Sequence, residues 1–81
     1  MKPYKCTLSK FRWRGEQMVR ATIVPVDKEV GCPISCMKIW QGRQTYYEAL
    51  REAYASASCY GIRPSLIDNT EAIKYFSKGV I

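Results

Sequence analysis

The chain has 81 residues, of which 47% are hydrophobic, and a formal net charge of +6. This length predicts one small domain over residues 1–81. A domain of this size buries only about 60% of the surface that its unfolded chain exposes. It has no run of about 18 apolar residues, so we expect no membrane span, and its N-terminal residues show no apolar leader or cleavage site, which predicts a cytoplasmic protein.

The positive charge is concentrated near the N-terminus. Residues 1–20 contain six cations and one acid, a balance of +5, whereas residues 21–81 contain seven cations and six acids, a balance of +1. A basic patch in one segment is typical of a protein that binds a polyanion, although a solubilising surface has the same composition. We favour the functional interpretation because aromatic residues alternate with the cations.

The first predicted strand begins at Tyr4, since apolar and polar residues alternate as far as Leu8. The apolar parity then changes, because Phe11 and Trp13 are odd-numbered. A bulge near residues 9–10 would return the two rings to the core face. Alternatively, the register continues, and the rings lie on the outer face while the interleaved cations line the opposite one; these cations are Lys10, Arg12 and Arg14.

Two further strands are expected. Gly15-Glu16 is the predicted turn, and residues 18–24 form the returning strand, which Pro25 ends because proline cannot donate to a ladder. In this strand three residues are expected to face the core, Val19, Ala21 and Ile23, and three to face outward, Met18, Arg20 and Thr22. Residues 26–33 are interpreted as a loop, and residues 34–40 as the third strand.

Two helices follow. Thr45 and Glu48 have the spacing of a capping box, which predicts a main helix over residues 45–60 that Gly61 ends. A second capping-box pattern at residues 68–71 predicts a short helix over residues 69–77, with Ile67 and Ala72 as a hydrophobic staple. The expected fold is therefore α+β: a three-stranded antiparallel sheet packed on one main helix, extended by a short C-terminal helix.

The chain offers little for catalysis or cofactor binding. It has four cysteines but no histidine, which removes the usual general base and the usual partner of a nucleophilic cysteine; the cysteines are Cys6, Cys32, Cys36 and Cys59. We favour reduced structural thiols over a disulfide or a zinc site, since the three-residue spacing between Cys32 and Cys36 is not that of a tight zinc knuckle. We predict no enzyme activity, no metal and no cofactor.

The order of hairpin, third strand and alanine-rich helix resembles the ethylene-response-factor type of DNA-binding domain. The resemblance rests on residues 17–23, which look like the second strand of that family, on Trp40 before the helix, and on the Glu-Ala-Leu-Arg-Glu-Ala-Tyr run at residues 48–54. It covers roughly residues 8–61. In that family the outer sheet face enters the major groove, which would assign DNA contacts to four residues here: Arg12, Trp13, Arg14 and Arg20.

The predicted function is that of a small accessory protein from a phage or mobile element that binds nucleic acid in the host cytoplasm. Its expected binding surface comprises Lys5, Lys10, Phe11, Arg12, Trp13, Arg14 and Arg20. The alternative is an inhibitor of the anti-CRISPR kind, which the chain resembles in size and in its lack of catalytic residues. Such an inhibitor would use the same patch as a hot spot against an acidic host protein or ribonucleoprotein.

Overall fold

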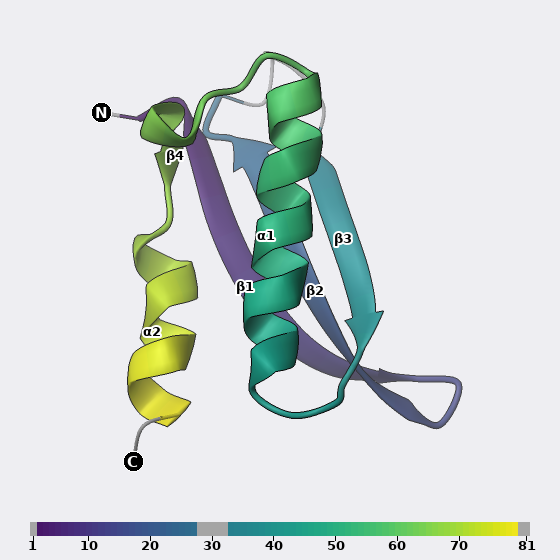
Figure 1. Cartoon of the computed structure of the whole chain (residues 1–81). Helices are drawn as coiled ribbons and strands as arrows, with labels where there is room; N and C mark the ends of the chain where they lie inside the picture. The colour runs from purple at the N-terminus through teal and green to yellow at the C-terminus, as the bar shows by residue number, and fades with distance from the viewer. Residues whose placement is uncertain (1, 28–32, 80–81) are drawn as a thin grey trace.

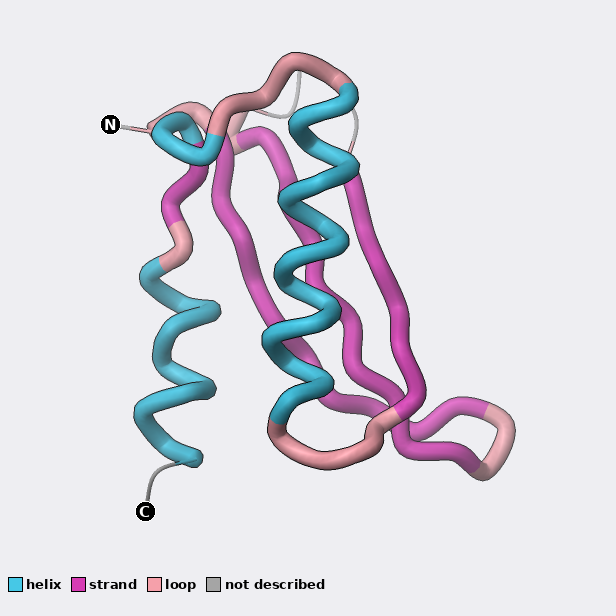
Figure 2. Tube along the Cα trace, in the orientation of Figure 1, coloured by secondary structure: helices cyan, strands magenta, loops and turns pink. Residues whose placement is uncertain are grey.

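The computed structural model describes residues 2–27 and 33–79 and has an α+β fold (Figure 1). Its elements in chain order are β1 (Tyr4–Trp13), β2 (Glu16–Pro25), β3 (Ile34–Ile39), α1 (Gln44–Cys59), a 3₁₀ turn (Pro64–Leu66), β4 (Ile67–Asp68) and α2 (Thr70–Gly79). The sheet order is β3-β2-β1-β4. Helix α1 lies across one face of the sheet, and α2 lies beside β1 (Figures 1 and 2).

The β1–β2 hairpin keeps one register along its whole length. Each residue of β1 pairs with one residue of β2, from Tyr4 with Pro25 to Trp13 with Glu16. The bulge considered for residues 9–10 is therefore not formed, and the alternation continues to the hairpin tip. The connecting residues are Arg14 and Gly15, rather than the predicted Gly15-Glu16.

The sheet has one more strand than the sequence predicted. Strand β3 pairs antiparallel with β2, as expected, but Ile67 and Asp68 pair parallel with Tyr4 and Lys5 of β1. The sheet is thus mixed and four-stranded. A two-residue strand has no periodicity that a sequence pattern could reveal, and its pairing depends on where α1 returns the chain.

The start of α1 differs from the predicted capping box. The helix begins at Gln44, and the Thr45 side chain, only 1% exposed, accepts a hydrogen bond of 2.8 Å from the backbone N–H of Gln41 instead of capping its own helix. The threonine hydroxyl therefore fastens the β3–α1 connection. Glu52, one turn beyond Glu48, forms an ion pair with Lys38 of β3.

The end of α1 is as predicted. Gly61 has a φ of +80°, its N–H donates to Ser58 O, and the N–H of Ile62 donates to Ala57 O. These two bonds form a Schellman motif, in which glycine supplies the left-handed residue without steric cost.

The start of α2 differs from the predicted capping box, because Asp68 bonds Thr70, two residues on, whereas a capping box bonds the residue three on. Asp68 Oδ1 accepts hydrogen bonds from the Thr70 N–H and hydroxyl, which hold the pKa of Asp68 below its usual value. The Glu71 carboxylate, the other half of the box, pairs with Lys5 of β1 instead. The staple residues Ile67 and Ala72 are both buried.

The core lies between the sheet and α1. The strands contribute larger side chains, and the helix contributes small ones; the buried set includes Cys6, Leu8, Val19, Ala21, Ile23, Ala49, Ala53, Ala57, Ile62 and Ile67. Half-buried Trp40 and Tyr54 pack against this set. Within the described residues, no helix is long and apolar enough to cross a membrane.

Candidate nucleic-acid interface

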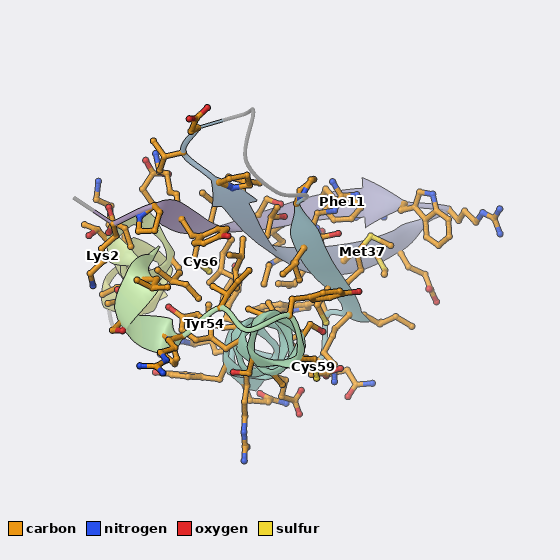
Figure 3. The ribbon with its side chains drawn as sticks, turned by 90° about the horizontal axis from the view of Figure 1, so that it is seen from above. Lys2, Cys6, Phe11, Met37, Tyr54 and Cys59 are labelled. Atoms are coloured by element: carbon orange, nitrogen blue, oxygen red, sulfur yellow. The ribbon has the colours of Figure 1, made fainter. Side chains whose placement is uncertain are left out.

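The sheet face opposite α1 is uncovered by any helix of the described chain. In Figure 3, Phe11 and Met37 project from this face, whereas Cys6 and Tyr54 lie between the sheet and the helices. The register places two aromatic residues and one arginine on it, namely Phe11 and Trp13 of β1 and Arg20 of β2. Because β1 has no bulge, the two rings lie on the outer face, which is the second of the two arrangements that the sequence left open.

An arginine side chain lies against each ring on the open face. The guanidinium carbon of Arg20 lies 4.6 Å from the centre of the Phe11 ring, and that of Arg14 lies 4.6 Å from the centre of the Trp13 ring. Trp13 is still 47% exposed. We call these four residues the open-face cluster: Phe11, Trp13, Arg14 and Arg20. Guanidinium groups over aromatic faces form cation–π contacts, so the cluster combines flat rings with positive charge.

Arg14 occupies an unfavourable backbone position. Its φ is +52° and that of Gly15 is +80°, so both turn residues have the left-handed conformation of a type I′ hairpin. Glycine and asparagine adopt this conformation readily, but for arginine it costs about 1–2 kcal/mol. The Arg14 guanidinium lies against the Trp13 ring. The tip of the β1–β2 hairpin projects beyond the rest of the sheet (Figure 2).

Two cations of the predicted surface point to the other side of the sheet. Lys10 faces the helix side, where its ammonium lies 3.8 Å from the centre of the Trp40 ring. Arg12 has the same parity, and its Nη1 donates to Gly15 O at 3.3 Å across the turn. The interleaving of cations and aromatics therefore separates these two residues from the open-face cluster.

Lys5 is also apart from the cluster. It lies six residues before Phe11, about 20 Å along an extended strand. Its Nζ is 2.8 Å from Glu71 Oε1, and this carboxylate raises the pKa of Lys5 while its own pKa is lowered. Lys5 thus joins α2 to the sheet.

Apolar residues that the predicted surface omitted complete the open face. Met18 lies between Phe11 and Ile39 in neighbouring strands, and these neighbours leave it only 6% exposed although it points outward. Met37 and Ile39 of β3 are 43% and 49% exposed. The alternation of residues 34–39 contained this signal, since Met37 and Ile39 share a face with Ser35.

A shallow hollow of about 430 Å³ adjoins the cluster across β2 and β3. It is lined by Arg20, Thr22, Pro33, Ser35 and Met37. Arg20 Nη2 also lies 3.5 Å from the Met37 sulfur, so this side chain borders both the Phe11 ring and the hollow. The two hydroxyl groups and the guanidinium can donate hydrogen bonds to oxygen atoms of a ligand.

The three described cysteines lie outside this surface. Cys6 is buried and Cys59 is exposed, and both are free thiols, as is half-buried Cys36; Cys32 lies outside the described residues. Burial raises the pKa of Cys6 to about 11, which leaves it protonated at neutral pH. In the described parts of the chain, no three cysteine or acidic side chains cluster as a metal site would require.

No protein-family profile matches the chain, and no curated protein or solved structure is significantly similar to it. The resemblance to the ethylene-response-factor type of domain stays a prediction. The function is therefore inferred from the geometry of the open face.

Proposed function

We propose that this protein binds nucleic acid through the open face of its sheet and acts without catalysis. The observation that carries the proposal is the pairing of each ring with an arginine, Phe11 with Arg20 and Trp13 with Arg14. Aromatic rings offer stacking surfaces to bases, and guanidinium groups neutralise phosphates. A phage or mobile-element origin stays a prediction from size and composition.

The charge distribution supports a polyanionic ligand. Strands β1, β2 and β3 contain one acidic residue, Glu16, and five cations: Lys5, Lys10, Arg12, Arg20 and Lys38. The ion pair of Lys38 with Glu52 and that of Lys5 with Glu71 neutralise cations away from the cluster. The guanidinium groups of Arg14 and Arg20 lie against aromatic rings, which do not neutralise their charge.

A salt titration of binding tests the proposal. We would measure the affinity of the wild type for labelled single-stranded DNA, single-stranded RNA and duplex DNA, and compare it with an Arg14→Ala/Arg20→Ala variant. Each neutralised phosphate contributes about −0.7 on single strands and about −0.9 on duplex to the slope of log K against log salt. We expect the slope of the variant to be shallower by about 1.4 to 1.8.

The matched control is Arg51→Ala/Arg63→Ala, which removes the same charge at two exposed positions outside the strands. It should leave the slope close to that of the wild type. If both double variants lowered the slope equally, binding would depend on net charge in general and not on the open-face cluster. No binding of any nucleic acid at low salt would refute the proposal.

The second candidate function is inhibition of a host protein or ribonucleoprotein, in the manner expected of an anti-CRISPR protein. Exposed Met37 and Ile39 favour it, since phosphates gain nothing from apolar side chains, whereas Trp and Arg are common interface hot spots. This function predicts negligible affinity for free nucleic acid. It also predicts co-purification with one host complex that is lost in Trp13→Ala.

A further inference from the structure

We infer that the ligand of the open face is single-stranded nucleic acid, with two neighbouring unpaired bases stacked on Phe11 and Trp13. This inference rests on the proposed function and narrows its ligand to unpaired strands. The decisive features are the spacing of the two rings and the apolar surface around them.

The spacing of the rings suits a spread strand. Phe11 and Trp13 are two residues apart on the same face of β1, which separates them by about 6.7 Å along the strand. Successive bases of a stacked helix are only about 3.4 Å apart. Bases that occupy both rings must therefore be unstacked from each other, which a single strand permits and a paired duplex resists.

The composition of the open face also favours unpaired bases. Met37 and Ile39 border the cluster with large exposed apolar surfaces, and Met18 fills the space between Phe11 and Ile39. The outside of a duplex presents mainly phosphates and sugars to such a surface, and its base faces are covered by their neighbours. Unpaired bases expose their faces and can cover both the rings and the methionine.

Few cations remain for a duplex backbone. Because Lys10 and Arg12 lie on the other side of the sheet and Lys5 pairs with Glu71, the cluster retains Arg14 and Arg20 as its cations. We infer that each base takes the place of the guanidinium over a ring, and that the displaced arginine moves to a neighbouring phosphate. In the free protein the same arginines lie against the rings, and Trp13 keeps 47% of its surface exposed.

The first experiment compares strands of one sequence. An oligonucleotide of about 12 nucleotides, within the range of known single-strand sites, is titrated as DNA and as RNA, alone and annealed to its complement. We expect at least one single strand to bind about tenfold or more tightly than the duplex, since one base stack alone is worth about 5-fold or more. Equal or tighter binding of the duplex would overturn this inference and leave the proposed function standing, whereas no binding of any probe would overturn both.

The second experiment tests the rings. Trp13→Ala and Phe11→Leu should each weaken single-strand binding by about 5- to 100-fold, because base–aromatic stacking is lost. Phe11→Leu retains apolar bulk where Phe11 is half-buried, and circular dichroism checks that both variants fold. Tyr47→Ala removes an exposed aromatic from α1, away from the open face, and should leave the affinity unchanged. Unchanged affinity in both ring variants would contradict the stacking site.

The third experiment reports stacking directly. Trp13 and Trp40 are the two tryptophans of the chain, so Trp40→Phe leaves Trp13 as the one indole reporter. Saturation with the single strand should quench this fluorescence strongly, because a stacked base contacts the ring. Binding without any change in Trp13 emission would show that no base stacks there and would contradict the inference.

Discussion

The ammonium of Lys10 lies 3.8 Å from the centre of the Trp40 indole, on the helix side of the sheet. Trp40 in turn meets Tyr46 of α1 edge to face, with 5.1 Å between ring centres. An exposed cation from the most basic segment of the chain thus lies over a ring that packs against the core. Proximity in sequence to Phe11 and Trp13 does not make Lys10 part of their surface.

Lys10→Met should affect stability more than binding. Loss of the contact with Trp40 is expected to lower the free energy of unfolding by about 0.5–1 kcal/mol, measured by urea denaturation. The salt slope of nucleic-acid binding should not change, whereas Arg20→Met should make it shallower by about 0.7 on a single strand. If both variants changed the slope equally, Lys10 would belong to the binding surface.

Arg14→Asn should raise stability and weaken binding. Asparagine suits the left-handed turn position that Arg14 occupies at φ +52°, so we expect the free energy of unfolding to rise by about 1 kcal/mol. Affinity for nucleic acid should fall, because the cation beside Trp13 is lost. Arg14→Lys is the control, since it retains both the charge and the strain and should leave stability nearly unchanged. A less stable Arg14→Asn protein would argue against strain at the turn.

The close approach of α1 to the sheet depends on its buried alanines. Ala53→Leu adds volume at a fully buried position and should destabilise the protein by about 1–3 kcal/mol. Ala55→Leu makes the same change at an exposed position of the same helix and should have little effect, since both residues favour helices. Similar melting temperatures for the two variants would contradict the described packing of α1.

Alkaline pH should weaken the fold through Cys6. The buried thiol has a pKa of about 11, whereas the unfolded thiol ionises near its ordinary value of 9.0. Between these values the unfolded state binds fewer protons than the folded state, so the free energy of unfolding falls as pH rises, by about 2–3 kcal/mol once both have ionised. Below about pH 9 the thiol is protonated in both states, and the contribution of Cys6 is retained in full.

Urea denaturation at about pH 8 and about pH 10.5 measures this effect. Cys6→Ala should show a smaller difference between the two pH values than the wild type, and its constant packing cost cancels in that difference. Some loss should remain, because burial also raises the pKa of Tyr54 and an acidic partner raises that of Lys38. Exposed Cys59→Ala should retain the full wild-type difference. If Cys6→Ala lost as much free energy of unfolding between the two pH values as the wild type, Cys6 would not be the source of the alkaline loss.

The sequence by itself determined the elements whose signals are local. Alternation from Tyr4 to Leu8 and the glycine at position 61 follow from backbone geometry and nearest neighbours, and both are confirmed. The α+β class and the hairpin–strand–helix order were predictable for the same reason.

Only the tertiary structure decided how the basic segment is divided. The continuous register of β1 placed Phe11 and Trp13 on the open face and Lys10 on the helix side, where its ammonium contacts the Trp40 ring. The partners of Thr45 and Glu71 were likewise a backbone N–H before the helix and a lysine on β1, rather than the neighbours that a capping box implies. These contacts join residues whose spacing is set by how the elements pack, and a pattern within one segment carries no information about that spacing.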